Sequence, residues 1–313
     1  MSIECGASEK ASIEIPGQGA PFYELVRDLS DPNVVGSEAN EVVQEVFEEV
    51  QQATGIDVEA AAREMAEGKL VTPSIAQVVL YAAGYAGGRV LFKKGVKAEY
   101  YRGHSASAMV AAGLAGVIAV HEGAKLMQRR GEHMAEAAHN NPGTVAVTDL
   151  SLEKLAEICK ACGVYMANLN SPVQTMISGR VPNIVQARKM IKSLGSRATI
   201  FRDWSQGPVH TPFFQEAEDR YRADLAVPEV SDPQAGFVRN IDGEITNDAE
   251  SIREDLGGIA QQVNWTKGGL ALLASGVRRF VEISPKSRKI TSGLAQDLSP
   301  DHEIQTGHLF DYL

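Results

Sequence analysis

Residues 98–113 read AEYYRGHSASAMVAAG, which is a short stretch with strand character, a Gly-His-Ser turn and a run of small residues. Small side chains let a helix pack closely against the preceding strand, and a serine at such a strand–turn–helix elbow presents its hydroxyl at the end of the sheet. The following helix points its N-terminus at the same place. We therefore interpret Ser105 as a candidate nucleophile and the backbone amide of Ala106 as a candidate donor to an oxyanion.

The elbow differs from the usual pattern G-x-S-x-G in its last position. The five residues are Gly-His-Ser-Ala-Ser, so Ser107 stands where a glycine is usual. A single G-x-S is common by chance, and serine is also a good N-cap. On these residues alone, Ser105 is either a nucleophile or the cap of a helix expected over Ala106–Val120.

Composition and charge exclude some classes of partner. Hydrophobic residues make up 44% and charged residues 22% of the 313 residues, as is ordinary for a globular chain. The formal net charge of −10 argues against a nucleic-acid partner, which needs a basic stripe. One local basic cluster is either a contact for an acidic protein or a solvated surface. It consists of Arg278, Arg279, Lys286, Arg288 and Lys289.

The three cysteines, Cys5, Cys159 and Cys162, give no disulfide framework. The last two share a predicted helix without a second pair, so we expect buried or surface thiols rather than a zinc or redox site. Residues 1–12 lack the apolar core of a signal peptide, and no apolar run is long enough to span a bilayer. We expect a cytoplasmic monomer without membrane contact, metal or bound cofactor.

The order of predicted elements indicates an α/β fold in two parts. A large α/β-hydrolase-like domain with a parallel sheet is expected over residues 1–140 and 206–313. Residues 141–205 are expected to form an inserted ferredoxin-like subdomain, because their elements follow the order βαββαβ and both ends are rich in turn residues. These elements are strands 144–147, 164–169, 174–178 and 198–204, and helices 151–162 and 181–194.

The large domain is expected to begin with a short strand that runs into the tight turn Pro-Gly-Gln-Gly. An acidic amphipathic helix, a helix that is apolar nearly all round, and a third helix follow before the insertion. After the insertion, two strands and three helices complete the domain. The ranges are 13–20, 38–68, 72–91 and 121–138, then 237–241, 251–261, 266–275, 279–283 and a last helix that ends near Ala295.

His210 follows the insertion, between Pro208 and Pro212. The prolines predict an irregular, exposed segment. Histidine is the usual partner of a serine nucleophile because its pKa lies near working pH. The acid expected between serine and histidine has no clear candidate, since Asp203 is close only in sequence. A structural or surface histidine remains the alternative.

Taken in order, these signals resemble the malonyl-CoA:acyl-carrier-protein transacylase family, the acyltransferases of fatty-acid and polyketide synthesis. The resemblance covers roughly residues 13 to 295, and its motifs are specific when taken jointly. They are Pro16-Gly17-Gln18-Gly19, Thr72-Pro73-Ser74, Gly103-His104-Ser105, Arg130-Gly131, Asn168-x-Asn170-Ser171-Pro172, Pro208-x-His210, Val263-Asn264-Trp265-Thr266 and Glu282-Ile283-Ser284-Pro285.

The resemblance implies a ping-pong transfer between two thiols. Ser105 would take the acyl group from a thioester as a serine ester, with His210 as general base and acid of a Ser-His dyad. The amides of Gln18 and Ala106 would form the oxyanion hole. A backbone carbonyl near Asn264 would orient the histidine in place of an acid.

The resemblance also implies the nature of the substrates. Arg130 matches the arginine that pairs with the free carboxylate of a malonyl-type group. A guanidinium is costly to bury without an anion, so this match argues against a hydrolase of simple acyl chains. The implied partners are an acyl-CoA donor and an acidic acyl carrier protein, which would dock on the basic cluster. Further substrate-binding positions are His104, Asn170, Val209 and Asn264.

Several positions depart from the family pattern. Ser107 and Ala108 replace the residues usual after the elbow, and Asn264 replaces a glutamine that is one methylene longer. The turn usually read as Gly-Pro-Gly is Ser284-Pro285-Lys286, with extra residues after it. Ser107 adds a side chain where strand and helix crowd, which predicts a slightly opened elbow. We interpret the chain as a divergent, free-standing member.

Three hypotheses follow from the sequence. The first is transfer of a malonyl-type group from coenzyme A to the phosphopantetheine thiol of a carrier protein, in polyketide or fatty-acid synthesis. The second is transfer of a bulkier acyl or aminoacyl group between two carrier proteins, with the altered elbow and Asn264 widening the pocket. The third is a non-catalytic docking subunit that retains the fold.

Overall fold

The large sheet contains six strands, of which five run parallel. The computed structural model describes residues 10–137, 142–200, 209–298 and 304–313. In this part of the chain the strand order is β10-β9-β1-β2-β7-β8, and only β8 is antiparallel to its neighbour. The predicted α/β fold with a parallel sheet is confirmed. The strands are β1 (Lys10–Ile15), β2 (Tyr100–Gly103), β7 (Gly236–Val238), β8 (Ile245–Thr246), β9 (Val277–Glu282) and β10 (Gln305–His308).

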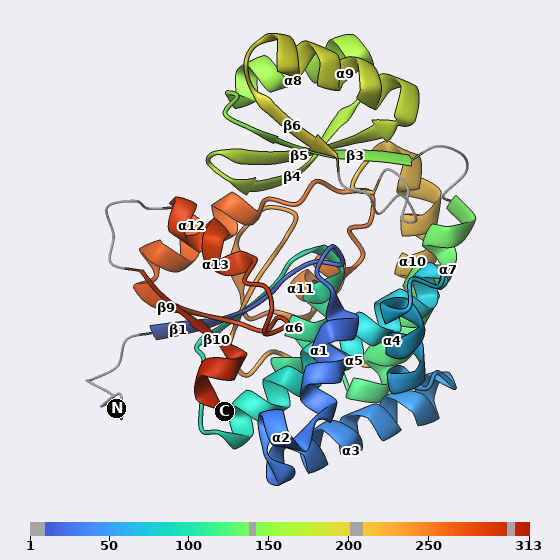
Figure 1. Cartoon of the computed structure of the whole chain (residues 1–313), viewed down its shortest axis with the longest axis vertical. Helices are drawn as coiled ribbons and strands as arrows, with labels where there is room; N and C mark the ends of the chain where they lie inside the picture. Colours follow the sequence, from blue (N-terminus) through green and yellow to red (C-terminus); the bar gives the residue numbers. More distant parts are fainter. Residues whose placement is uncertain (1–9, 138–141, 201–208, 299–303) are drawn as a thin grey trace.

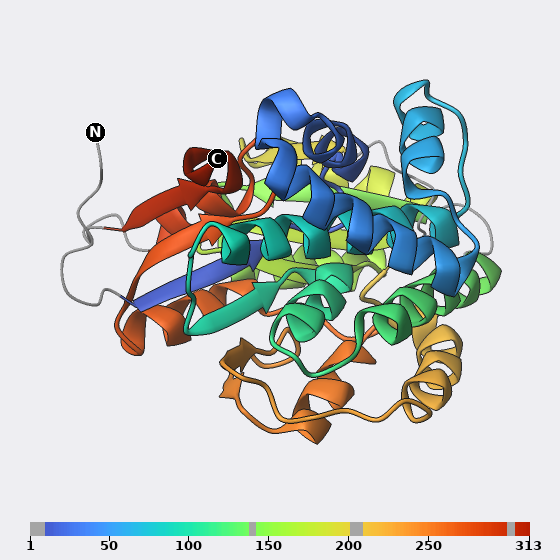
Figure 2. The same cartoon turned by 90° about the horizontal axis from the view of Figure 1, so that it is seen from below.

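Helices lie on both sides of this sheet. Figure 1 shows α12 and α13 on the side that faces the small sheet and α1 to α5 on the opposite side. Seen from below, β1 (blue) lies between β2 (teal) and β9 (orange), with helices of the N-terminal half packed across them (Figure 2). The helices are α1 (Phe22–Ser30), α2 (Pro32–Val35), α3 (Ser37–Thr54), α4 (Val58–Ala66), α5 (Pro73–Lys93), α6 (Ala108–Leu114), α7 (Val120–Ala137), α10 (Gln215–Leu225), α11 (Ala249–Leu256), α12 (Trp265–Ala274) and α13 (Thr291–Leu298).

Helix α5 forms the centre of the helical layer. It starts where Thr72 accepts a hydrogen bond from the amide of Ile75 and Pro73 occupies the first turn, a favourable N-terminus. Contrary to the expectation from sequence, α5 is long and apolar enough to cross a membrane by length and composition. However, 72% of the most apolar 18-residue stretch of this helix is buried inside the protein. There the helix packs against α3, α6 and α7. Packing within the core therefore explains its apolar surface.

The small sheet is antiparallel, with the strand order β4-β5-β3-β6. Element order and strand order both match the expected ferredoxin-like unit. Two helices lie on the face turned away from the large sheet (Figure 1) and enclose a separate apolar core with it. The elements are β3 (Pro142–Thr148), α8 (Leu152–Cys162), β4 (Tyr165–Ser171), β5 (Gln174–Arg180), α9 (Val181–Ser193) and β6 (Arg197–Ile200).

The predicted domain limits stay a prediction, because both junctions fall on segments that the structure does not describe, residues 138–141 and 201–208. The last part of the strand expected over 198–204 also lies outside the described residues. Two expected helices are broken. The helix expected over 38–68 is interrupted at Gly55, whose left-handed conformation (φ 74°) ends α3. The helix expected over 106–120 stops at Leu114, and a turn separates it from α7.

A buried ion pair connects β1, β2 and the start of α12. Arg102 donates from Nη2 and Nε to Oε2 of Glu14 at 2.6 and 2.8 Å, and each side chain is 1% exposed. The guanidinium also lies 3.7 Å from the ring centroid of Trp265 and donates to its carbonyl oxygen. Burial raises the pKa of Glu14 and lowers that of Arg102, and their mutual attraction opposes both shifts. Each charge is therefore stable here only with its partner.

Removing one partner should destabilise the fold strongly. We expect Arg102→Met to lower the free energy of unfolding by about 3–5 kcal/mol, because it leaves the Glu14 carboxylate buried without a cation. The matched control is Arg27→Met, which removes an exposed arginine from its pair with Asp28 and should cost less than about 1 kcal/mol. Urea unfolding followed by circular dichroism measures both values. Equal losses for the two variants would contradict the prediction.

Candidate active site

The elbow predicted around Ser105 is present and tightly packed. The chain leaves β2 at Gly103, makes a single 3-10 turn over Ser105–Ser107 and continues as α6. A Cβ atom at Gly103 would lie 1.9 Å from the carbonyl oxygen of Ser107, so only glycine fits this position. Ser105 itself has a left-handed backbone (φ 55°), which is unfavourable for a residue other than glycine. Such strain is typical of a nucleophile elbow.

Ser107, which departs from the usual glycine, is accommodated by a hydrogen bond. Its hydroxyl is buried and donates to the carbonyl oxygen of Pro16 at 2.5 Å. The amide of His104 in turn donates to the carbonyl oxygen of Ile15 at 2.9 Å. These contacts connect the elbow to the turn after β1. The side chain of Ser107, which was expected to crowd the strand and the helix, instead forms a hydrogen bond between the two segments.

Asn240, which sequence reasoning missed, holds the elbow from the opposite side. Its Oδ1 accepts from the amide of Ser105 at 3.0 Å, and its Nδ2 donates to the carbonyl oxygen of Gly103 at 2.9 Å. Asp255, at the end of α11, fixes the backbone here by accepting from the main-chain amides of Asn240 and Ile241, and its Oδ2 accepts from Asn240 Nδ2 at 3.4 Å. Burial raises the pKa of Asp255 to about 6. A buried amide therefore positions the strained turn.

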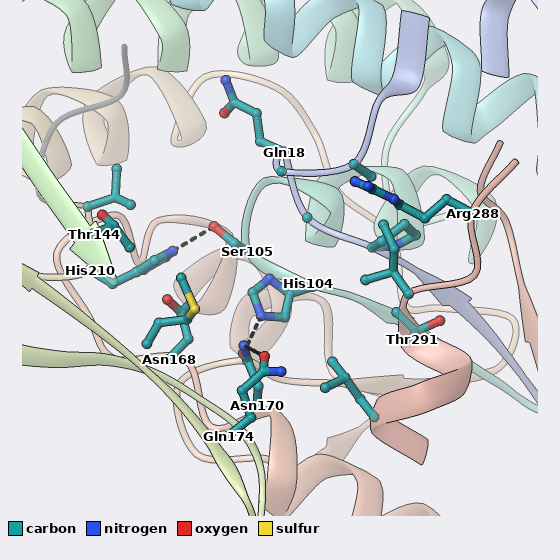
Figure 3. A pocket seen from close by; sticks show the side chains of 18 residues that line it. Gln18, His104, Ser105, Thr144, Asn168, Asn170, Gln174, His210, Arg288 and Thr291 are labelled. Carbon is teal, nitrogen blue, oxygen red and sulfur yellow. Dashed lines mark hydrogen bonds between the residues drawn. The ribbon is translucent and has the colours of Figure 1, made fainter. Parts of the chain in front are cut away.

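The structure brings Ser105 and His210 together. Their Oγ and Nε2 atoms lie 2.6 Å apart (Figure 3). The prediction that His210 is exposed was wrong, because the residue is only 4% exposed. Its backbone adopts a left-handed conformation (φ 58°). Its amide donates to the carbonyl oxygen of Ile259 and its Nδ1 lies 2.8 Å from the carbonyl oxygen of Gln261. Since a carbonyl only accepts, Nδ1 carries the proton and Nε2 is free to accept from the serine.

A main-chain carbonyl thus occupies the place of a third acidic residue. The resemblance implied a carbonyl near Asn264, and the one in contact belongs to Gln261, three positions earlier. Glu218 on α10 fixes this loop, because its carboxylate accepts from the amide of Ala260 and from the side chain of Gln261. Asp203, the acid considered from sequence, lies outside the described residues.

His210 is held in its neutral form. Burial lowers the pKa of His210 to about 3, and the positive charge of Arg130 acts in the same direction. The imidazole is therefore uncharged near neutral pH, the state that a general base requires. Arg130 on α7 is 5% exposed, and among the described residues it has no acidic partner, its one hydrogen bond being to Sδ of Met134. An uncompensated buried guanidinium beside the dyad is a site prepared for an anion.

A cavity of about 320 Å³ opens at Ser105, between the large sheet and the small one. The small sheet supplies part of its wall, and the other parts come from the turn after β1, the elbow, the segment of His210, and α13 with the residues before it (Figure 3). The lining residues are Pro16, Gly17, Gln18, Gly19, Ala20, His104, Ser105, Thr144, Asn168, Asn170, Gln174, Met176, Val209, His210, Arg288, Ile290, Thr291 and Leu294.

The chain matches known proteins over nearly its whole length. The family model of the acyl transferase domain matches residues 15–304. The chain belongs to this acyl transferase family. The malonyl CoA-acyl carrier protein transacylase of Escherichia coli (strain K12) is 27% identical to it over 288 residues, which are 90% of each chain.

Solved structures agree with the assignment to the acyl transferase family. The malonyl CoA-acyl carrier protein transacylase of Coxiella burnetii superposes with a TM-score of 0.86 at 26% identity, covering 96% of this chain and 94% of that one. A malonyl-transacylase in complex with its type II PKS acyl-carrier protein gives 0.85 at 27% identity, with coverages of 96% and 95%. The family resemblance predicted from the motifs is confirmed.

Most residues that the resemblance implied for this acyl transferase surround the cavity. Gln18, His104, Asn170 and Val209 line it, whereas Arg130 and Ala106 are not among its lining residues. His104 Nε2 bonds to Oδ1 of Asn170 at 3.0 Å, and its buried Nδ1 has no partner in the described part of the chain. Burial lowers the pKa of His104. These side chains therefore give the cavity wall neutral polar groups.

Asn264, which the resemblance implied as a substrate-binding residue, lies outside the cavity lining. It precedes α12, where its side chain donates to the carbonyl oxygen of Ile241 and its amide to that of Asn240. Its side chain therefore supports the turn after β7 that carries Asn240. This position gives no support to the idea that Asn264 widens the pocket for a bulkier cargo.

Two further features of the sequence, the cysteines and the basic cluster, are not part of the Ser105–His210 dyad. Cys159 and Cys162 are free, buried thiols on α8, and Cys5 lies outside the described residues. The described ranges contain no group of three or more His, Cys, Asp and Glu residues that could hold a metal ion. The residues of the basic cluster have different surroundings, since Lys289 pairs with Asp311 whereas Arg288 lines the cavity, and its role in docking a carrier protein stays a prediction.

The low pKa of His210 predicts an unusual pH profile for this acyl transferase. We expect the rate at which a neutral sulfonyl fluoride labels the serine to stay flat from pH 8 down to about 5, because His210 gains a proton only towards pH 3. Intact-protein mass spectrometry follows the labelling, with Ser105→Ala as the unlabelled control. A rate that halves near pH 6.5 would show that His210 has the ordinary pKa of a histidine, and it would contradict the claim that burial lowers this pKa.

Proposed function

We propose that this acyltransferase moves a malonyl-type group from coenzyme A to the phosphopantetheine thiol of an acyl carrier protein. The observation that carries the proposal is the unpaired, buried Arg130 beside the Ser105–His210 hydrogen bond. A serine ester formed here would bring a free acyl carboxylate near a guanidinium that lacks an anion. The names of the relatives, malonyl transacylases that act on carrier proteins, support the same substrates.

The first half-reaction forms a serine ester. His210 Nε2 takes the proton from Ser105 Oγ while Oγ bonds to the thioester carbonyl carbon. The negative charge that develops on the carbonyl oxygen would rest on the amides of Gln18 and Ala106. When the C–S bond breaks, the leaving thiolate takes the proton from His210. The carrier thiol then attacks the ester along the reverse path, which restores the free serine.

Substrate binding would also prepare the base. The positive charge of Arg130 helps to keep the pKa of His210 low. A carboxylate bound to Arg130 neutralises that charge, so the pKa of His210 rises towards the working pH and proton transfer from Ser105 becomes easier. A malonyl group would thus promote its own transfer, whereas an acyl chain without a carboxylate would leave the histidine a weaker base.

The setting of the reaction belongs to the same proposal. We infer that the product feeds polyketide or fatty-acid synthesis and that the enzyme works in the cytoplasm, where free buried thiols such as Cys159 and Cys162 persist. The proposed steps use only protein groups and the two thiol substrates, with no resident cofactor. The strained elbow and oriented histidine favour catalysis over a docking role.

Loss of the hydroxyl should abolish loading. We expect wild-type protein to gain a malonyl adduct during brief incubation with malonyl-CoA, and Ser105→Ala to gain none, because Ser105 Oγ is the hydroxyl that bonds to His210 Nε2 in the described part of the chain. Intact-protein mass spectrometry detects the adduct. The matched control is Ser193→Ala, an exposed serine on α9, which should load normally. An adduct on Ser105→Ala would place the nucleophile elsewhere.

Loss of the guanidinium should discriminate between acyl groups. We expect Arg130→Ala to weaken malonyl loading by about 2–5 kcal/mol in kcat/KM, because only malonyl carries the carboxylate, and to leave acetyl loading equal or faster, because loss of the cation makes His210 a stronger base. Its neighbour Arg129 is exposed and pairs with Glu132 and Asp224, so Arg129→Ala is the matched control. Rates come from rapid-quench mass spectrometry with both donors. Unchanged malonyl loading would exclude the proposed role of Arg130.

A further inference from the structure

The segment between β9 and α13 holds Arg288 at the cavity in a fixed backbone. Ser284 Oγ donates to the carbonyl oxygen of Arg288 at 2.9 Å, and the amide of Arg288 donates to the carbonyl oxygen of Pro285 at 3.0 Å. The buried carboxylate of Glu282 accepts from the amides of Ile290 and Ser292. The backbone on both sides of Arg288 is therefore well supported, although its side chain is exposed.

The guanidinium of Arg288 has no hydrogen-bond or ion-pair partner among the described residues. It is also the one formally charged side chain in the described lining of the cavity. Two other members of the basic cluster are engaged elsewhere: Arg278 donates to the carbonyl oxygens of Leu273 and Val277, and Lys289 pairs with Asp311. An acidic protein that keeps a free arginine at its reaction cavity presents a local site for an anion.

Arg288 lies on the other side of Ser105 from His210 (Figure 3). Beside it on the same wall is Thr291, which is 1% exposed and whose Oγ1 has no partner in the described part of the chain. Arg130, by contrast, does not line the cavity, and its charge acts on His210. A thioester that reacts at Ser105 with its acyl group towards His210 and Arg130 would have the opposite wall, which holds Arg288, for its thiol arm.

We propose that Arg288, assisted by the hydroxyl of Thr291, binds the phosphate of the phosphopantetheine arm that coenzyme A and a carrier protein share. The proposal rests on the function proposed above. A guanidinium matches a phosphate through two parallel hydrogen bonds, and the exposed position lets the phosphate keep part of its hydration.

Two kinds of donor, with and without the phosphate of the arm, test the proposal. Malonyl-phosphopantetheine and malonyl-CoA carry that phosphate, the latter with the nucleotide in addition, whereas malonyl-pantetheine has the same thioester and arm without it. We expect Arg288→Ala to raise KM about tenfold or more for both donors that carry the phosphate, the effect of losing a charge-assisted contact, and to leave KM for malonyl-pantetheine unchanged. A loss confined to malonyl-CoA would place the contact on the nucleotide and overturn the proposal. Initial rates of Ser105 malonylation, read by intact-protein mass spectrometry, give these values.

Control variants make each outcome decisive. Arg288→Lys keeps the charge and should retain most of the preference for malonyl-CoA, and Lys286→Ala, in the same loop but outside the cavity lining, should behave as wild type. Equal effects of Arg288→Ala on donors with and without the phosphate, or no effect on any donor, would overturn the proposal while Ser105 still loads. Wild-type protein that loads from none of the donors would instead refute the proposed function itself.

Discussion

The hydrogen bond between Ser105 and His210 depends on two residues that both adopt a left-handed backbone. Each such conformation costs on the order of 1–3 kcal/mol outside glycine and persists only where surrounding contacts determine it fully. The surroundings here are buried polar groups: Asn240 holds the turn of the serine, and the carbonyl oxygens of Ile259 and Gln261 hold the histidine. The backbone conformations of Ser105 and His210, and the contacts that hold them, therefore set the geometry of the dyad before substrate binds.

Burial and charge then set the chemistry of that geometry. Because His210 is buried near Arg130, the imidazole is neutral and the cavity is biased towards anions. Arg288 adds a second cation on the other side of Ser105, where solvent remains accessible. A substrate with anionic groups at both ends would be aligned across the serine by these two arginines, which is a way to orient a thioester without enclosing it.

Local patterns revealed the elbow, the βαββαβ order and the family, because each depends on residues close together in the chain. Asn240 and Glu218 escaped detection since their partners lie 135 and 42 residues away and no spacing marks them. The exposure of His210 was predicted wrongly because flanking prolines report on the backbone and not on what covers it. The position of Asn264 outside the cavity likewise depends on tertiary packing, which a motif match does not contain.

The small sheet meets the large part of the chain through its edge strand β4. Val263 forms a bridge with Asn168 and exchanges backbone hydrogen bonds with Ala167 and Leu169, and the hydroxyl of Thr266 donates to the carbonyl oxygen of Leu169. An unpaired edge is a template for aggregation, and here the chain covers it with its own segment. Asn168 and Asn170 of the same strand line the cavity. The contact that holds this wall of the cavity in place therefore also covers an edge that could otherwise pair with other molecules.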